Sequence, residues 1–282
     1  MEIKTVPIAA TEQEVIARHQ MNRDAWEESA TSYTTDVEKT IDFLRTGGNS
    51  LHPIEQRNLG SLSEWCRSAI HLQCASGKDT LSLWNSGVKD VTGLDISQKM
   101  IDNATVTAKE IGIPARWFCC DVLDAPTELD GSADLVYTGQ GSVCWIHDLD
   151  QWAKVVARLL KPGGVFHVFD DHPMSILFDP ESDRLVLLDG TNYFSHCEQV
   201  VGWPSSYIAD DSLGVPPEKL KKKFVRLWPL ADIFQSLRQA GLVIEYLGEH
   251  MEEYYDAFPK LEAHWRGRIP MTFSLKAKKP IG

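Results

Sequence analysis

The chain has 282 residues, of which 43% are hydrophobic and 24% are charged, and both fractions are typical of a globular protein. Lys and Arg number 28 against 40 Asp and Glu, so the net charge is −12, a sign that repels the phosphates of nucleic acids. No stretch approaches the roughly 20 apolar residues of a membrane-spanning helix, and the N-terminus lacks the apolar core of a signal peptide. We therefore expect a cytoplasmic protein without a nucleic-acid or membrane partner.

Cysteine spacing argues against structural metal or disulfide bonds. The six cysteines are Cys66, Cys74, Cys119, Cys120, Cys144 and Cys197. They form no CxxC pair and no zinc-ligand spacing, and several lie in apolar runs, where a small buried thiol is the ordinary interpretation. We expect no disulfide and no metal site.

The N-terminal residues are predicted to form an extension of the main domain. Residues 11–30 are rich in Glu, Gln and Arg and predict one helix, and a looser segment follows as far as Ser61. We expect residues 1–61 to form a helical lid over a main domain that spans residues 62–282.

The middle of the chain alternates short apolar runs with helical patterns, which is typical of βαβ units in a parallel sheet. Ser97 is placed to cap the second helix, and the Lys-Pro-Gly-Gly run that ends at Gly164 should end the third. The pattern predicts a three-layer α/β domain with a topological switch point. The expected strands are 69–74, 89–95, 115–120, 133–138 and 164–170, and the expected helices are 78–86, 98–111 and 148–160.

The remaining residues predict an insertion and the end of the sheet. Residues 172–228 contain short apolar pieces broken by Gly, Pro and Asp, so we interpret them as an insertion of strands and loops that covers the substrate. A helix is expected at 229–240, before Gly241, and strands at 242–247 and 271–277.

A cofactor signature follows the first two expected strands. Small residues between His71 and Thr80 let the backbone approach a ligand before a helix begins. Asp95 ends the second strand 18 residues past Gly77, where an acid accepts hydrogen bonds from the hydroxyls of an adenosine ribose. A solvated carboxylate at a strand end is the alternative for Asp95. The turn and the acid together favour a site for an adenosine-containing cofactor.

These residues resemble those of class I S-adenosylmethionine-dependent methyltransferases, of the small-molecule group that is similar to ubiquinone methyltransferases. The resemblance covers roughly residues 59–170. The family's E/D-x-G-x-G-x-G loop falls on His71, Gln73, Ala75 and Gly77, so the acid and two glycines differ. The run from His71 to Cys74, together with Tyr-Thr-Gly at 137–139 and Asp-Asp-His-Pro at 170–173, is similar to a bacterial subset of the family.

The resemblance implies a Rossmann-like methyltransferase sheet, mostly parallel with an antiparallel last strand, and S-adenosyl-L-methionine as the cofactor. Asp95 would hold the ribose, and Asp121 would contact the adenine amine unless it serves only as a helix cap. Trp26 and Tyr33 match the W-x6-Y spacing of a lid over the cofactor, although Trp26 could be only an apolar anchor of its helix. Thr138 and Gly139 match the segment that lies beside the reactive sulfonium. The implied cofactor contacts are Trp26, Tyr33, Cys74, Ala75, Ser76, Gly77, Asp95, Ile96, Met100, Asp121, Val122, Thr138 and Gly139.

A proton acceptor is needed only where the methyl acceptor sheds a proton. The candidates are His147, His172 and Tyr33, with a slight preference for His147, and Asp170 and Asp171 are the other titratable groups near the expected position of the acceptor. His167 fits a buried strand position. Aromatic and acidic residues favour a flat or cationic acceptor, although large aromatics also fill ordinary cores. The candidate substrate contacts are Tyr137, Trp145, Asp170, Tyr193, Trp203 and Tyr207.

The resemblance implies an enzyme that methylates a small molecule, with an aromatic or indole-type intermediate of secondary metabolism as the expected acceptor and the methylated atom left open. A non-catalytic protein that binds S-adenosylmethionine is an alternative, because the glycine loop is altered. An NAD-dependent oxidoreductase is a weaker one, because the G-x-G-x-x-G pattern of that class is absent.

Overall fold

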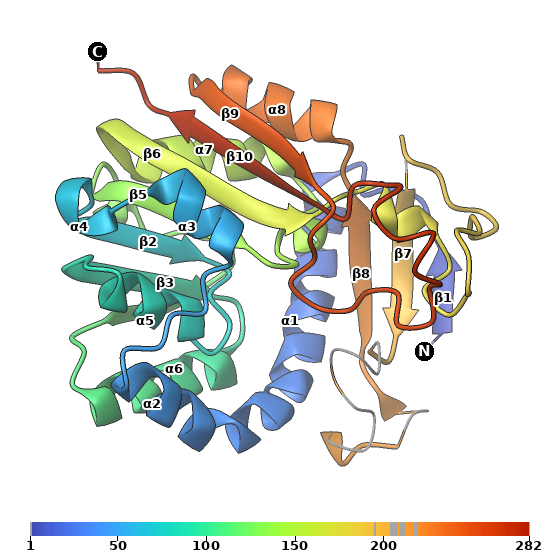
Figure 1. Cartoon of the computed structure of the whole chain (residues 1–282), viewed down its shortest axis with the longest axis horizontal. Coiled ribbons are helices and arrows are strands. Elements are labelled where there is room, and N and C mark those ends of the chain that lie inside the picture. Colours follow the sequence, from blue (N-terminus) through green and yellow to red (C-terminus); the bar gives the residue numbers. More distant parts are fainter. Residues whose placement is uncertain (1, 195, 204–207, 209–212, 217–218, 282) are drawn as a thin grey trace.

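The main sheet of the computed structural model has the strand order expected of a doubly wound domain (Figure 1). The structure describes residues 2–194, 196–203, 208, 213–216 and 219–281. The sheet order is β4-β3-β2-β5-β6-β10-β9, with β2 to β6 parallel and β10 antiparallel to β6. The predicted fold class is confirmed. The strands are β2 (Ser68–Leu72), β3 (Asp90–Asp95), β4 (Arg116–Cys119), β5 (Ala133–Gly139), β6 (Leu160–Asp171), β9 (Val243–His250) and β10 (Thr272–Lys278).

Helices cover both faces of this sheet, so its central strands are buried. The buried cluster that contains Leu44, Leu59 and Leu81 lies on one face, and the cluster that contains Trp152 and Leu237 lies on the other. Helices of the first face are α2 (Val37–Arg45), α3 (Pro53–Leu59), α4 (Leu62–Trp65), α5 (Lys78–Asn85) and α6 (Gln98–Ile111). Those of the second face are α7 (Leu149–Leu159) and α8 (Leu230–Gln239).

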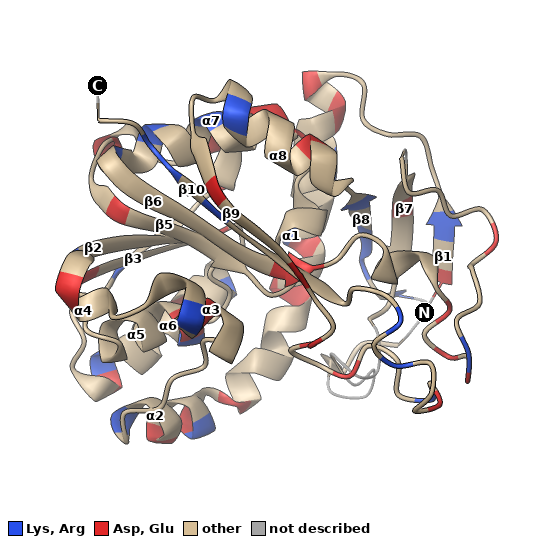
Figure 2. Cartoon of the chain, turned by 45° about the horizontal axis from the view of Figure 1, so that its top comes forward, with Lys and Arg blue, Asp and Glu red and all other residues tan. Residues whose placement is uncertain are grey.

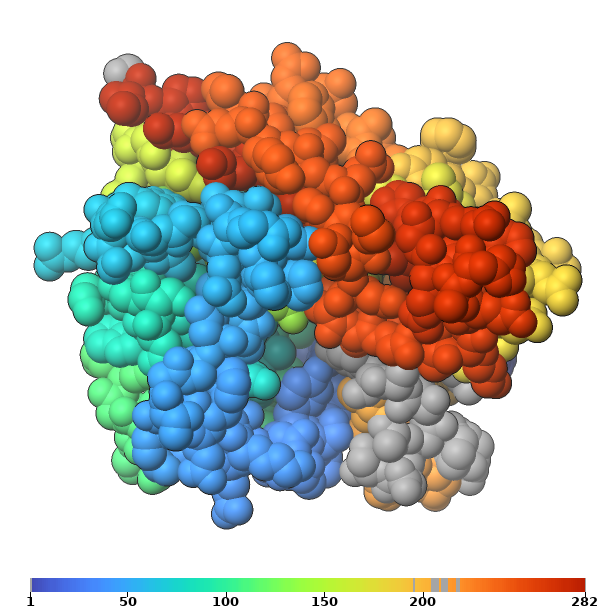
Figure 3. All heavy atoms as spheres, in the orientation of Figure 1, coloured from blue at the N-terminus to red at the C-terminus, as the bar shows by residue number. Residues whose placement is uncertain are grey.

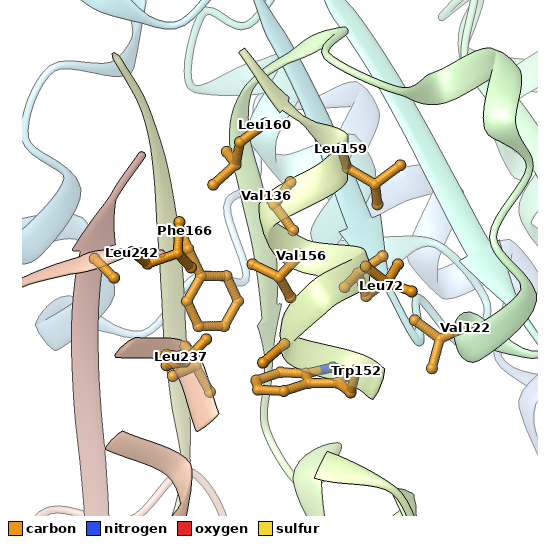
Figure 4. Packing of buried hydrophobic residues seen from close by; sticks show 14 of the residues in the cluster. Leu72, Val122, Val136, Trp152, Val156, Leu159, Leu160, Phe166, Leu237 and Leu242 are labelled. Carbon is orange, nitrogen blue, oxygen red and sulfur yellow. The ribbon is translucent and has the colours of Figure 1, made fainter. Parts of the chain in front are cut away.

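Helix α7 shows why the sequence forms this core. Trp152, Val156 and Leu159 follow the spacing of one helical face, and all three are fully buried. They pack with Val136 of β5 and Phe166 of β6 in one cluster (Figure 4). Figure 2 marks Lys, Arg, Asp and Glu mostly on the helices and connecting segments, and the central strand β2 carries none of them.

Most element boundaries follow the prediction. Ser97 caps α6 by accepting from the backbone N–H of Met100. The largest differences are at the end of the first helix and at the start of β6. The first helix, α1 (Glu12–Thr35), continues to Thr35, so Tyr33 lies within it. Strand β6 begins already at Leu160, with a register shift against β5 near Ala133 that accommodates the Pro-Gly-Gly run.

A second, smaller sheet was not expected. It has the order β1-β7-β8 and consists of β1 (Glu2–Thr5), β7 (His196–Val201) and β8 (Lys222–Leu227). Strand β1 pairs antiparallel with β7, so the N-terminal segment and the insertion are joined by hydrogen bonds. Helix α1 runs between the two sheets (Figure 1), and its Asn22 side chain both donates to and accepts from the backbone of Phe224 on β8.

The second half of the N-terminal extension packs against the main sheet, unlike α1, which lies between the two sheets. Leu44, Leu51 and Leu59 belong to the same buried cluster as Ala69 of β2 and Val91 of β3. Residues 37–65 therefore cover the main sheet, and α1 is the part of the extension that spans the two sheets. Short 3-10 helices complete the described elements: η1 (Val122–Asp124), η2 (Thr127–Leu129), η3 (Val143–Trp145) and η4 (Ser175–Leu177). None of the described helices is long and apolar enough to cross a membrane.

Candidate active site

A cavity of about 880 Å³ opens at the carboxyl ends of the parallel strands, where open α/β sheets bind their ligands. Residues 73–76, 94–96, 120–122 and 139–142, which end or follow β2, β3, β4 and β5, form its floor. Helices α1 and α2 and the pair Tyr254 and Tyr255, from the segment between β9 and β10, form its walls. Figure 3 shows the hollow between the N-terminal residues and this C-terminal segment. The volume lies in the upper part of the usual range of ligand sites, about 300–1,000 Å³.

The loop after β2 keeps the backbone of a glycine-rich loop although its glycines differ. Among the described residues, the non-glycine residues with positive φ are Gln73 (58°), Ala75 (45°) and Gln140 (57°), and all three line the cavity. Gly77 adopts a φ of 80° directly before α5. Left-handed backbone costs an L-residue about 1–2 kcal/mol, and such strain is typical of functional sites.

His71 stands where the family loop carries an acid. Its Nδ1 lies 2.8 Å from the hydroxyl of Thr80, and burial lowers the pKa of the ring to about 3. Position 71 is therefore a neutral imidazole that borders the cavity. The side chain of Gln73 donates to the carbonyl of Ser142 at 2.7 Å, and its Oε1 is buried without a hydrogen-bond partner.

Asp95 ties the ends of two neighbouring strands together. Its Oδ2 accepts from the N–H of Ala75 at 2.8 Å, and its Oδ1 accepts from the N–H of Ser97 at 2.9 Å. Burial raises the pKa of Asp95 to about 6, against the lowering effect of these hydrogen bonds. A carboxylate oxygen has two lone pairs, so both oxygens can accept a further hydrogen bond. The geometry fits the two hydroxyls of a ribose.

Asp121 follows β4, the neighbour of β3, and its side chain is held from two directions. Its Oδ1 accepts from the N–H of Leu123, which makes it the cap of η1, and its Oδ2 lies 2.6 Å from Nδ1 of His19 on α1. The other ring nitrogen of His19 accepts from the N–H of His147 at 3.1 Å. His19 therefore joins α1 to the ends of β4 and β5.

Aromatic side chains form the wall next to α1. The ring of Trp26 lies 5.2 Å from that of Trp145 and 4.8 Å from that of Trp203, measured between centroids. Trp26, Tyr33 and Trp145 line the cavity. Trp203 is buried behind them in a cluster with Ile208 and Leu220, and its ring contacts Trp26, Trp145 and the Nζ atom of Lys223.

The structure brings together most of the expected cofactor residues. Those that line the cavity are Trp26, Tyr33, Cys74, Ala75, Ser76, Asp95, Ile96, Asp121, Val122 and Gly139, together with the expected substrate contact Trp145. Gly77, Met100 and Thr138 do not line it. Met100 is fully buried. Thr138 is also fully buried, and its hydroxyl donates to the carbonyl of Leu72. These two side chains therefore lie beneath the residues that line the cavity.

Several expected substrate contacts point elsewhere, and these expectations need correction. Tyr137 is fully buried and donates to Oε1 of Glu55 at 2.6 Å. Asp170 accepts from the N–H groups of Gly141, Ser142 and Val143, so its carboxylate fixes the loop after β5. The hydroxyl of Tyr193 lies 3.4 Å from the N–H of Leu230, away from the cavity lining. Tyr207 lies outside the described residues.

The two histidines expected as proton acceptors also lie outside the cavity lining. The Nε2 of His147 lies 3.3 Å from the carbonyl of Phe224, and burial lowers the pKa of its ring to about 3. The Nε2 of His172 lies 2.9 Å from Glu249, and its Nδ1 accepts from the N–H of Met174. These hydrogen bonds hold both rings away from the cavity lining, so neither ring is placed to accept a proton there. Tyr33 remains a candidate.

Sequence reasoning missed residues that the cavity includes. His19, Gln140, Tyr254 and Tyr255 line it. The position of His19 seven residues before Trp26, two helical turns along α1, could have placed both on one helix face. No local pattern pointed to Tyr254, because the segment between β9 and β10 contains no regular element.

Part of the chain is similar in sequence to known methyltransferases. A family model described as "Methyltransferase domain" matches residues 69–164. The ubiquinone biosynthesis O-methyltransferase of Bordetella avium (strain 197N) is 27% identical over 135 residues, which are 46% of this chain and 55% of that relative. The chain thus matches only about half the length of this curated relative.

Solved structures share the fold over most of the chain. An S-adenosylmethionine-dependent methyltransferase from Mesorhizobium loti has a TM-score of 0.55 and 21% identity, covering 82% of this chain and 99% of that one. The [4+2]-cyclase SpnF has a TM-score of 0.54 and 18% identity, covering 98% and 99%. Residues 69–164 therefore match a methyltransferase domain, and the chain shares the fold of these solved structures.

Proposed function

We propose that this protein transfers the methyl group of S-adenosylmethionine to a small aromatic acceptor, such as a phenol or an indole-type intermediate of secondary metabolism. The observation that carries the proposal is that one cavity is lined by small and acidic residues on its floor and by aromatic residues on its walls. The strand ends supply small residues and the two acids Asp95 and Asp121, and the walls supply Trp26, Tyr33, Trp145, Tyr254 and Tyr255.

The two acids suit the adenosine of the cofactor. Asp95 would accept hydrogen bonds from the ribose, and Asp121 would accept from the adenine amine. The loop at Cys74, Ala75 and Ser76 would lie along the methionine part, because its left-handed backbone allows close approach. The bound cofactor supplies a sulfonium methyl group that is activated for in-line displacement, so the chain's main task is to position the acceptor.

The aromatic walls favour a flat acceptor, since ring faces stack on planar groups and attract cations. Helix α1 carries two of these aromatic residues across the cavity and connects the two sheets. We infer that α1 acts as a lid that excludes water, and that the insertion of residues 172–228 supports the lid from behind through Trp203 and Phe224.

A screen of phenols, indoles and amines with methyl-labelled cofactor tests the proposal. We expect label in at least one aromatic acceptor, and quenching of tryptophan fluorescence by S-adenosylhomocysteine but not by NADH. Fold alone does not fix the reaction, as the cyclase among the solved structures illustrates. Binding of S-adenosylhomocysteine without any transfer would favour the non-catalytic alternative, and binding of NADH alone would favour the oxidoreductase.

A further inference from the structure

Tyr254 and Asp171 form a hydroxyl–carboxylate pair at the wall of the cavity. The Tyr254 hydroxyl donates to Oδ2 of Asp171 at 2.7 Å. Tyr254 lines the cavity, whereas Asp171, the last residue of β6, lies behind it. A proton can therefore pass between the cavity and Asp171 through the tyrosine oxygen.

This hydroxyl lies close to the expected position of the reaction. A Cβ atom added at Gly141 would lie 3.2 Å from the Tyr254 oxygen, and Gly141 is two residues past Gly139, which the family resemblance places beside the sulfonium. Gly141 has a φ of 90°, a conformation that favours glycine. The loop after β5 thus leaves room for the hydroxyl next to the methyl group that would be transferred.

The surroundings of Asp171 differ from those of its neighbour Asp170. Backbone N–H groups of the loop after β5 donate to Asp170, whereas no Lys, Arg or His among the described residues forms an ion pair with Asp171. Burial raises the pKa of Asp171 to about 8, with further increases from Asp170 and Glu253, and the Tyr254 hydrogen bond opposes them. A carboxyl group with these surroundings holds a proton more readily than an ordinary aspartate.

The charged and titratable groups around the pair come from several elements, and each has its own contacts. They are Asp170 and His172 beside Asp171, Glu253 and Tyr255 beside Tyr254, Cys144 after β5 and Arg226 on β8. Arg226 donates to the carbonyls of His196 and Leu227, and the His172 ring contacts Glu249. Among the described residues, Tyr254 is thus the only side chain that forms a hydrogen bond with the Asp171 carboxylate.

We propose that Tyr254 and Asp171 together accept the proton that the methyl acceptor loses. As the acceptor's O–H, N–H or ring C–H bond breaks, its proton passes to the Tyr254 oxygen while the Tyr254 proton passes to the ionised Asp171. The acceptor's electron pair forms the new bond to the methyl carbon, and the electrons of the broken S–C bond stay on sulfur. One positive and one negative charge are neutralised, so the step balances. The inference rests on the proposed function and limits the acceptor to a group that loses a proton on methylation.

The test compares Tyr254→Phe and Asp171→Asn with Tyr246→Phe, an exposed tyrosine on β9 that serves as the control. Tyr254→Phe and Asp171→Asn should each lower kcat about 100-fold or more, the usual contribution of a general base, whereas Tyr246→Phe should not. The affinity of each variant for S-adenosylhomocysteine should stay within about twofold of the wild type. The acceptor must meet an ionised Asp171, so wild-type kcat/KM should rise as the pH increases through about 8. This rise should disappear in Asp171→Asn.

A second readout does not need turnover. Carbon-13 NMR of the aspartate carboxyls should show one group that titrates near pH 8, and its signal should be absent in Asp171→Asn. Normal kcat in both variants, with an active wild type, would overturn the inference and point to Tyr33. A wild type that transfers no methyl group would overturn the proposed function, and the absence of any aspartate carboxyl titrating above pH 7 would independently overturn the assignment of Asp171.

Discussion

The floor and the walls of the cavity are built in different ways. The floor comes from four strand ends within residues 72–142, and each group lies directly after a strand of the parallel sheet. The walls come from α1 and α2 and from Tyr254 and Tyr255, which lie more than 200 residues from α1 along the chain. The comparison teaches that strand order creates the floor, the proposed cofactor half, whereas the packing of distant covering segments creates the walls, the proposed acceptor half.

The largest expected effect concerns the floor. Replacing Asp95→Ala should weaken the binding of S-adenosylhomocysteine by about 1.5–3 kcal/mol, the range for hydrogen bonds to a charged group, or roughly 10- to 150-fold. Isothermal titration calorimetry measures it, and Asp95→Asn should lose less because it keeps one acceptor. Asp90→Ala changes an exposed acid at the other end of the same strand and serves as the control. Unchanged affinity in Asp95→Ala would remove Asp95 from the cofactor half.

The next effect is a pH dependence of the same binding. The pKa of Asp95 is raised to about 6 by burial, and the ribose hydroxyls need the ionised form as acceptor. Affinity should therefore be constant above about pH 7 and fall as the pH decreases through 6, by up to about tenfold per pH unit. Titrations at pH 5, 6, 7 and 8 measure it. If Asp95→Asn retained the same pH dependence, another group would be responsible.

A smaller effect should appear where α1 contacts the floor. His19→Ala removes the partner of Asp121 and leaves the N–H of His147 without its acceptor, a loss of about 1–3 kcal/mol in stability. We expect a lower melting temperature and an affinity for S-adenosylhomocysteine that is reduced about fivefold, or ~1 kcal/mol.

Two further variants sharpen this comparison. His19→Asn can still donate to Asp121 and should lose less, and Arg23→Ala, on the exposed side of α1, should change neither quantity. A lower melting temperature with unchanged affinity would mean that α1 and the floor act independently.

The smallest effect concerns strain in the loop after β2. Ala75 has a φ of 45°, which costs an alanine more than a glycine. Ala75→Gly should therefore raise the free energy of unfolding by about 0.5–1 kcal/mol, measured by urea denaturation. Ala17→Gly in the exposed middle of α1 should have the opposite sign, with a loss of about 1 kcal/mol. Destabilisation by both glycines would show that the loop is relaxed with alanine.

Much of the main domain could be predicted from the sequence because its signals are local. Alternation of apolar runs and helical patterns placed β2 to β6 and α5 to α7 within a few residues, and the spacing from Gly77 to Asp95 placed the acid at the cavity. The strand β1 was not predicted, since four exposed residues become a strand only by pairing with β7, almost 200 residues away.

By itself, the sequence determined the parallel sheet and the side chains at its strand ends, because a strand end follows from the residues next to it. Tertiary structure decided which side chains reach the cavity. His147 and Tyr137 stand at the expected strand end, yet hydrogen bonds to Phe224 and Glu55 turn them away. His19 and Tyr254 enter from segments whose position depends on contacts with Asp121 and Asp171. Such contacts join residues far apart in the chain, and no local pattern of residues records them.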